Sequence, residues 1–194
     1  SVLPGNLFVA LHGERFDGHD FLDQAVEMKA GGLLVDRDTG RNWGPLPVIL
    51  VSDTLTALGE VAKNWRRRFP IPVLAITGSS GKTTTKEMTA SILSRRRSVL
   101  KTQGNYNNLI GLPLTLLRLT PNHELAVLEL GANRPGEIAR LTQIAEPDVT
   151  LITNVGPAHL EGFGSLEGVG REKGDIFRHM PEGGAAVLNL DDPY

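Results

Sequence analysis

The segment Val73–Lys86 (VLAITGSSGKTTTK) constrains the fold more than any other part of this 194-residue chain. A short apolar run, typical of a buried strand, leads directly into a glycine-rich loop. A helix is expected to follow from about Lys82. Strand, glycine-rich turn and helix in this order are typical of α/β proteins, in which helices cover a mostly parallel sheet.

The rest of the second half continues the alternation of strand-like and helical runs. Strand-like runs occur at AVLEL, VTLITNV and AAVLNL, with helical stretches between them. We therefore expect residues 71–194 to form a P-loop-type domain, with a mostly parallel sheet covered by helices on both faces.

The first half predicts a separate, small α/β domain with the order strand, helix, strand, strand, helix. Apolar runs at Asn6–Leu11, LLVD and PVILV predict the strands. Apolar residues at helical spacing predict helices over Asp20–Ala30 and Thr54–Phe69. Pro70 and Pro72 end the second helix, because proline removes a hydrogen-bond donor and restricts the residue before it. We expect the domain boundary at residue 70.

Composition excludes several classes of protein. With 20 basic and 22 acidic residues, the chain has no global positive field that would draw it to nucleic acid or to an anionic membrane. The basic runs Arg66–Arg68 and Arg95–Arg97 are expected at helix C-termini, where cations complement the helix dipole. No run approaches the roughly 20 apolar residues of a membrane span. The absence of cysteine excludes disulfides and thiol chemistry, and it fits a cytoplasmic protein.

The glycine-rich loop and the start of the following helix carry the pattern of a phosphate site. Glycines permit a tight turn that aims N–H groups at phosphate oxygens, and the helix N-terminus adds its dipole. A lysine then reaches the terminal phosphates, and a threonine hydroxyl ligates Mg²⁺. The common loop has four residues between its glycines, whereas this one has two. The alternative is a glycine-rich turn with a lysine in solvent. The predicted nucleotide-binding residues are Gly78, Ser79, Ser80, Gly81, Lys82, Thr83 and Thr84.

Polar residues follow two later strands. Glu129 ends the run AVLEL, so it is expected at the carboxyl end of a strand, where open α/β sheets bind their ligands. A carboxylate beside a phosphate loop suits Mg²⁺, which prefers hard oxygen donors, and Gly131 permits close approach. Asn154 lies at the end of the run VTLITNV, and His159 follows that run, at the same edge. The residue types alone also allow a surface glutamate, a strand-capping asparagine and a solvated histidine.

The short loop GxxGKT resembles that of the Mur ligases and their folylpolyglutamate synthase relatives. Together with TGSSGKTTTKE, three further segments are similar to the branch of this family that adds D-alanyl-D-alanine. A tripeptide-forming relative is expected to show Thr-Asn in place of Ser79-Ser80. The resemblance covers essentially the whole chain, and the three segments are Gly104–Leu119 (GNYNNLIGLPLTLLRL), Leu128–Ile138 (LELGANRPGEI) and Ile152–Phe177 (ITNVGPAHLEGFGSLEGVGREKGDIF).

The resemblance implies roles that composition leaves open. His159 is similar to a histidine that binds a second Mg²⁺, and Asn154 to a residue that orients the site. Composition alone predicts that Lys173 points at water. In the resemblance it matches a carbamylated lysine that supports the second metal, since a lysine near cations loses its proton more readily and adds CO₂. The implied metal ligands are Thr83, Glu129, His159 and Lys173, and the implied catalytic residues are Lys82, Asn154, His159 and Lys173.

The segment Gly5–Phe21 (GNLFVALHGERFDGHDF) resembles the part with which this branch holds the UDP portion of its substrate. The residue types alone favour a plain loop, in which glycine and aspartate make turns. The substrate-binding residues implied by the resemblance are Ser1, Gly18, His19, Asn105 and Asn108.

The resemblance implies an ATP-dependent amide ligase of peptidoglycan precursor synthesis with two Mg²⁺ sites. ATP phosphorylates the terminal carboxylate of UDP-N-acetylmuramoyl tripeptide, and the amine of D-alanyl-D-alanine attacks the acyl phosphate. We expect a monomer, and a fragment that lacks the C-terminal domain and cannot complete the ligation. A P-loop ATPase without a ligase step, a non-catalytic UDP-sugar-binding module, and a folate-type or cyanophycin-type ligase remain alternatives.

Overall fold

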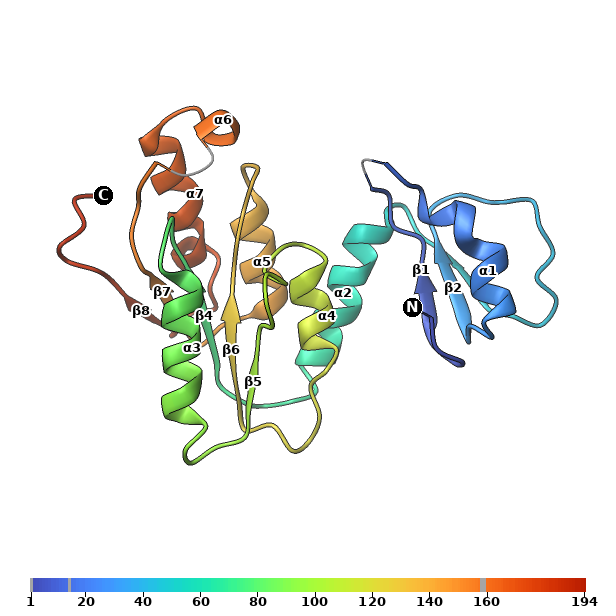
Figure 1. Cartoon of the computed structure of the whole chain (residues 1–194), viewed down its shortest axis with the longest axis horizontal. Helices are drawn as coiled ribbons and strands as arrows, with labels where there is room; N and C mark the ends of the chain where they lie inside the picture. Colours follow the sequence, from blue (N-terminus) through green and yellow to red (C-terminus); the bar gives the residue numbers. More distant parts are fainter. Residues whose placement is uncertain (1, 14, 158–159) are drawn as a thin grey trace. The chain divides into compact units, whose positions relative to one another are not determined.

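The computed structural model describes the chain except for Ser1, Glu14, Ala158 and His159, and it omits the side chains of Leu160 and Glu161. The chain divides into two compact units, Ser1–Glu60 and Val61–Tyr194, each with its own sheet (Figure 1). The division falls within helix α2 (Thr54–Arg66), ten residues before the boundary predicted from the prolines. No helix among the described residues is long and apolar enough to cross a membrane.

The N-terminal unit is built on a three-stranded parallel sheet. Its strands are β1 (Leu7–Val9), β2 (Gly32–Val35) and β3 (Val48–Leu50), in the order β1-β2-β3. The central strand β2 is buried along its whole length. The predicted helix begins as a 3-10 turn, η1 (Gly18–Phe21), and continues as α1 (Leu22–Glu27). The predicted order of strands and helices in this unit is confirmed.

The second unit is a five-stranded, entirely parallel sheet with the order β5-β6-β4-β7-β8 (Figure 1). The central strand β4 therefore lies between β6 and β7, so the carboxyl ends of these three strands meet at one edge. The edge strand β5 was not predicted. The strands are β4 (Val73–Thr77), β5 (Val99–Lys101), β6 (Leu125–Glu129), β7 (Val149–Ile152) and β8 (Ala185–Val187).

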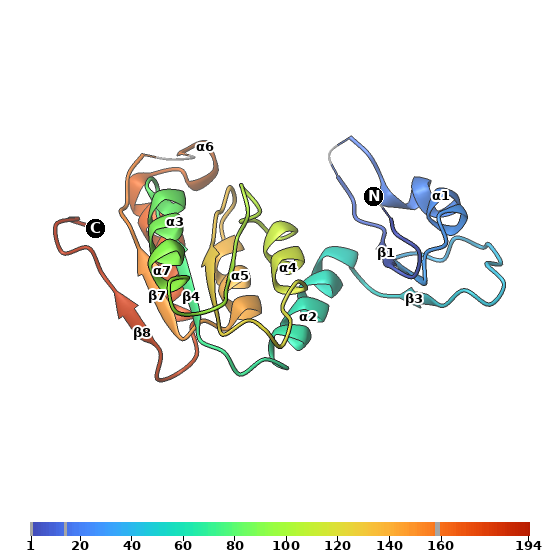
Figure 2. The same ribbon diagram turned by 60° about the horizontal axis from the view of Figure 1, so that its bottom comes forward.

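Helices cover both faces of this sheet, as predicted (Figure 2). Side chains alternate along each strand, so that Ile76 and Val127 pack with Ala90 of α3, whereas Ala75 and Leu128 pack in the larger core on the other face. That second core receives residues from α4, α5 and α7. The helices are α3 (Lys82–Leu93), α4 (Gly111–Leu116), α5 (Glu137–Ala145), α6 (Leu160–Phe163) and α7 (Leu166–Arg178).

The basic run at the end of α2 has a structural role. Arg66 is buried, and its guanidinium donates to the carbonyl oxygens of Ala145 at 3.0 Å and Phe69 at 3.0 Å. Burial lowers the pKa of Arg66, while Asp148 and Glu146 act in the opposite direction. The guanidinium thereby ties the end of α2 to the end of α5, and it binds a terminal carbonyl of that second helix and carbonyls beyond the end of its own.

Candidate nucleotide and metal site

The phosphate loop connects β4 to α3 through two glycines that no other residue replaces without strain. Gly81 has a φ of 76° and forms the N-cap of α3, so it occupies the left-handed region. Gly78 has a φ of 147°, and a Cβ atom on it would lie 1.9 Å from Oγ1 of Thr153. The end of β7 therefore approaches the loop so closely that a side chain at Gly78 has no room.

Residues after β7 hold the loop in place. Ser79 donates its N–H to the carbonyl oxygen of Asn154 at 2.9 Å, and Ser80 donates its N–H to Asn154 Oδ1 at 3.0 Å. Thr153 Oγ1 donates to the carbonyl oxygen of Ser80 at 2.6 Å. The hydroxyl of Ser79 accepts from the N–H of Gly156 at 2.9 Å. Asn154 thus lies against the loop that the sequence predicted it to orient.

This arrangement differs from one sequence expectation. Successive loop N–H groups were expected to face phosphate, but those of Ser79 and Ser80 are donated to Asn154, because the short loop runs directly along the end of β7. The N–H groups in the first turn of α3, from Lys82 to Thr84, have no acceptor within the helix. These groups, together with the helix dipole, make this end of the loop suitable for an anion.

Lys82 is half-buried at the start of α3, and its Nζ donates to the carbonyl oxygen of Gly78 at 2.8 Å. Burial lowers the pKa of the Lys82 ammonium, and the nearby Glu129 carboxylate acts in the opposite direction. The ammonium is therefore held above the loop, where it lines two adjoining pockets.

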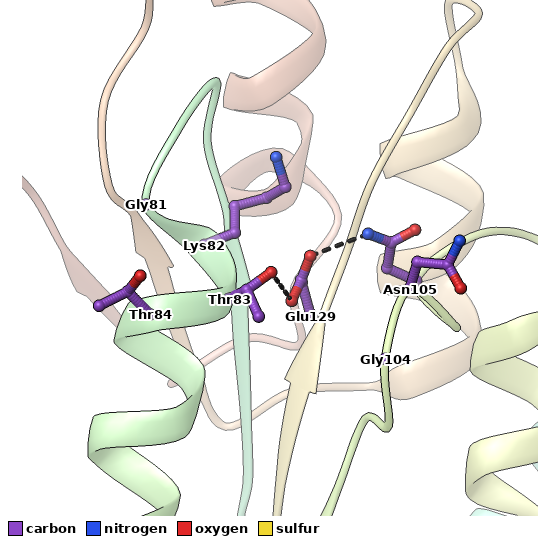
Figure 3. A pocket seen from close by; sticks show the side chains of 8 residues that line it. Gly81, Lys82, Thr83, Thr84, Gly104, Asn105 and Glu129 are labelled. Atoms are coloured by element: carbon purple, nitrogen blue, oxygen red, sulfur yellow. Dashed lines mark hydrogen bonds between the residues drawn. The ribbon is translucent and has the colours of Figure 1, made fainter.

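Thr83 and Glu129 face one another at the base of the first pocket (Figure 3). Thr83 Oγ1 donates to Glu129 Oε2 at 2.9 Å, and Asn107 Nδ2 donates to Glu129 Oε1 at 2.8 Å. Only 2% of Glu129 is exposed. Thr84 points away from the carboxylate (Figure 3). The structure thus brings together two of the four predicted Mg²⁺ ligands, one from α3 and one from β6.

The donor set at this pocket fits Mg²⁺. A hydroxyl and a carboxylate lie within hydrogen-bond distance of each other, and both are hard oxygen donors of the kind that Mg²⁺ shares with phosphate. The pocket has a volume of about 380 Å³, large enough for the phosphate end of a nucleotide. It is lined by Gly81, Lys82, Thr83, Thr84, Gly104, Asn105, Asn107 and Glu129.

A second pocket of about 200 Å³ adjoins the first and contains two lysines, Lys82 and Lys173. Lys173 comes from α7 and is only 2% exposed, so the interpretation from composition that it points at water is wrong. Burial, together with the positive charge of Lys82, lowers the pKa of Lys173 to about 8, with Glu172 acting in the opposite direction. The two ammonium groups make this pocket suitable for an anion.

Glu172, which the sequence interpretation missed, anchors the helix that carries Lys173. Its Oε2 accepts the N–H of Gly136 at 2.8 Å, and its Oε1 accepts the N–H of Ile138 at 2.8 Å. These are the unpaired donors at the start of α5. The buried carboxylate therefore fastens α7 to α5 and fixes the direction in which Lys173 projects. Nothing in the local sequence distinguishes Glu172 from a solvent-exposed helix residue.

The asparagine of the Gly104–Leu119 segment that contacts Glu129 is Asn107. Asn105 and Asn108 were instead predicted from the sequence, as substrate-binding residues. Asn105 is exposed and lines both pockets, and Asn108 lines the second. Asn108 Oδ1 also accepts the N–H of Gly111 at 2.8 Å, at the start of α4. Gly131 leaves room for Asn107, since a Cβ there would lie 2.9 Å from Asn107 Cγ. The one sequence feature that could have identified Asn107 as a site residue is its position in the Gly104–Leu119 segment, which resembles the family.

Two predicted site residues lie outside the described residues. They are His159, predicted as a ligand of the second metal, and Ser1, predicted to contact the substrate. Both assignments stay predictions.

In the N-terminal unit, Gly18 is required by close packing. A Cβ on Gly18 would lie 2.7 Å from Ala10 Cα, and its N–H is donated to the carbonyl oxygen of Leu11 at 2.8 Å. Glycine at this position therefore already has a structural reason, and the predicted substrate contact of Gly18 stays a prediction.

His19 is buried within a small network of charged groups. Its Nδ1 lies 2.7 Å from Asp17 Oδ1, and its ring stacks on that of His12 with centroids 5.2 Å apart. The N–H of His19 also donates to Asp17 and holds the pKa of that carboxyl well below its usual range, with Arg37 adding to the effect. Both ring nitrogens face carboxylates, the second being that of Asp36. The substrate role of His19 stays a prediction.

The chain is similar to known proteins over nearly its whole length. A family model described as the Mur ligase middle domain matches residues 76–194. The UDP-N-acetylmuramoyl-tripeptide--D-alanyl-D-alanine ligase of Escherichia coli K12 is 54% identical over 191 residues, which is 98% of this chain and 42% of that protein. The enzyme of the same name from Bacillus subtilis 168 is 45% identical, covering 96% of this chain and 41% of its own length.

Solved structures agree with these matches. The MurF ligase of Thermotoga maritima in complex with ADP superimposes with a TM-score of 0.93 at 44% identity, covering all of this chain and 44% of that structure. The chain thus spans about two fifths of the length of the relatives that it matches. Because the family model covers more than half of its residues, this chain belongs to the Mur ligase family.

Proposed function

We propose that this chain is the substrate- and nucleotide-binding part of a ligase that adds D-alanyl-D-alanine to UDP-N-acetylmuramoyl tripeptide. The observation that carries the proposal is the Thr83–Glu129 pair beside Lys82, next to a pocket that holds a second buried lysine, Lys173. The names of the E. coli and B. subtilis relatives support this choice of substrates. The ligase acts as a cytoplasmic monomer.

The first pocket binds the phosphates of ATP. The N–H groups at the start of α3 and the Lys82 ammonium contact phosphate oxygens, and Thr83 and Glu129 hold Mg²⁺. Bound Mg²⁺ neutralises charge on the phosphates during transfer. The complex of the Thermotoga maritima relative with ADP supports nucleotide binding by this chain.

The second pocket receives the carboxylate of the tripeptide. The Lys82 ammonium attracts the anion, and the wall that this pocket shares with the first brings that carboxylate next to the phosphate to be transferred. A carboxylate oxygen attacks the terminal phosphorus of ATP, ADP leaves, and an acyl phosphate results. The amine of D-alanyl-D-alanine then displaces phosphate to form the amide, so no side-chain nucleophile is required.

Lys173 is carbamylated in the active enzyme and, with His159, supports a second Mg²⁺. The resemblance to the family suggests this role, and the burial of Lys173 beside the pocket agrees with it. A chain equilibrated with ¹³C-labelled bicarbonate should show a carbamate carbon signal by NMR that Lys173→Met removes and Lys101→Met retains. A signal that persists in Lys173→Met would contradict the assignment.

The N-terminal unit holds the UDP portion of the substrate. Ser1, Gly18 and His19 belong to the segments that contact it, while Asn105 and Asn108 meet the peptide portion at the pockets. The N–H groups of Gly18 and His19 are donated within the unit, to Leu11 and Asp17, and these hydrogen bonds hold the turn in place.

Calorimetric titration of the chain tests the proposal. UDP-N-acetylmuramoyl tripeptide should bind more tightly than UDP, and ADP should bind more tightly with Mg²⁺ than without it. Lys82→Ala should weaken ADP binding and leave UDP binding unchanged. Mg²⁺-dependent ADP binding without any preference for the muramoyl ligand would favour a P-loop ATPase. Muramoyl binding that is indifferent to nucleotide would favour a UDP-sugar-binding module.

A further inference from the structure

Lys86 is a buried cation that has no role in the proposed reaction. It lies on α3, one turn beyond Lys82, and none of its surface is exposed. Its Nζ makes no hydrogen bond with any described residue. The nearest carboxylate oxygens are Glu87 Oε1 at 3.1 Å and Glu129 Oε2 at 3.7 Å.

Packing alone does not explain a lysine at this position. Lys86 lies four residues before Ala90, so it projects from the same face of α3 toward the sheet, where Ile76 and Val127 form an apolar cluster. A methionine or leucine would fill such a position without the cost of removing an ammonium group from water. A charged group is retained in such surroundings when its charge has a partner or a function.

The partner that depends on Lys86 is Glu129. Glu87 is 46% exposed at its side chain and is also paired with Lys101, so it has a second cation and access to water. Glu129 is buried, and in the described part of the chain Lys86 is the one cation within 4 Å of its carboxylate. Because Glu129 is shielded from water, its attraction to Lys86 is less weakened by solvent than that of the half-exposed Glu87.

We propose that Lys86 is a positioning residue for the metal site, acting through Glu129. Thr83 donates to Oε2, Asn107 donates to Oε1, and the Lys86 ammonium attracts Oε2 from inside the protein. These three contacts fix the direction of the carboxylate at the edge of the nucleotide pocket. The inference rests on the proposed nucleotide function, because the orientation of Glu129 matters for Mg²⁺ that is shared with a phosphate.

A double-mutant cycle in urea unfolding tests the Lys86–Glu129 contact without any ligand. The cycle compares Lys86→Met, Glu129→Gln and the double variant, in a Trp43→Phe background so that Trp65 alone reports the second unit. Lys86→Met should lower the unfolding midpoint when residue 129 is Glu and should leave or raise it when residue 129 is Gln. Additive effects of the two substitutions would overturn the proposed contact.

The Mg²⁺ concentration needed for half-maximal ADP binding tests the metal role. Lys86→Met should raise it about 10-fold, as substitutions of residues that orient metal ligands do, while ADP binding without Mg²⁺ stays unchanged. Glu87→Gln is the matched control, since it removes the other carboxylate beside Lys86, and it should stay close to the unaltered chain. An unchanged or lower Mg²⁺ requirement in Lys86→Met would overturn the role.

The two measurements separate the possible failures. If the unaltered chain shows no Mg²⁺-dependent ADP binding, the proposed function fails, and the metal role of Lys86 fails with it even when the unfolding cycle shows coupling. If the unaltered chain binds ADP with Mg²⁺ but the cycle is additive, the proposed function stands and the inference about Lys86 is wrong.

Discussion

Thr83 Oγ1 lies 2.9 Å from Glu129 Oε2, although the two residues are 46 positions apart in the sequence. Thr83 lies in the first turn of the helix that follows β4, and Glu129 ends β6, which pairs directly with β4. The parallel register of two neighbouring strands therefore assembles the pair of oxygen donors. Changes to either side chain should act on Mg²⁺-dependent binding before they act on the fold.

Thr83→Val should remove most Mg²⁺-dependent ADP binding, because valine keeps the shape of threonine without its oxygen. We expect a loss of at least about 10-fold in affinity in the presence of Mg²⁺, and a much smaller change in its absence. Calorimetry measures both values. Thr89→Val makes the same substitution six residues further along α3 and should bind like the unaltered chain; equal losses in the two variants would contradict the role of Thr83.

Gly78→Ala should destabilise the second unit by about 2–3 kcal/mol, because the new Cβ would lie 1.9 Å from Thr153 Oγ1 in a backbone conformation that favours glycine. Urea unfolding followed by Trp65 fluorescence measures the change. Gly174→Ala is a suitable control, because no atom lies within 4 Å of its added Cβ and alanine is the better helix former. A tolerated Gly78→Ala would show that the loop moves away from β7 easily.

Glu172→Gln should cost about 1–3 kcal/mol of stability in the second unit. The carboxylate accepts two N–H groups at the start of α5, and an amide accepts one of them while directing its own NH₂ at the other. Glu182→Gln changes an exposed glutamate on the segment after α7 and should have no measurable effect on the urea midpoint. If both variants unfold at the midpoint of the unaltered chain, the carboxylate does not fasten the two helices.

Asp17→Asn should flatten the acid dependence of stability in the N-terminal unit. The pKa of Asp17 lies below its ordinary value of 3.8 in the folded chain, so its contribution is present above that value and is lost as pH falls below it. The variant should be less stable than the unaltered chain at pH 7 and should lose less stability between neutral and acid pH. Trp43 fluorescence in a Trp65→Phe background reports this unit, and Asp20→Asn serves as the control; parallel pH curves for all three chains would contradict the prediction.

The start of the second unit was predictable because its signals are local. The apolar run Val73–Thr77, the glycines after it and the helix from Lys82 follow one another without interruption, and backbone sterics leave few alternatives. The edge strand Val99–Lys101 escaped prediction because it has only three residues and follows a run of arginines. This strand forms by pairing with β6, and no local sequence pattern predicts that pairing.

Local sequence patterns did not predict which charged residues are buried. Lys86 and Lys173 have the composition of solvent-facing helix lysines, yet each lies beneath groups contributed by distant parts of the chain. The same limit applied to Asn107. Its neighbours Asn105 and Asn108 have identical chemistry, and only the path of the backbone past Gly131 decides which asparagine reaches Glu129.

The fastening of Ser79 and Ser80 to Thr153 and Asn154 has a thermodynamic consequence for ligand capture. A flexible glycine-rich loop loses conformational freedom when it closes around phosphate, and that loss subtracts from affinity. Here the loop is ordered by the protein itself, so the entropic penalty falls on folding instead of on binding. Nucleotide association should therefore be rapid and favoured by enthalpy. Selectivity for the ligand should then depend on the fixed shape of the loop and not on a loop that closes.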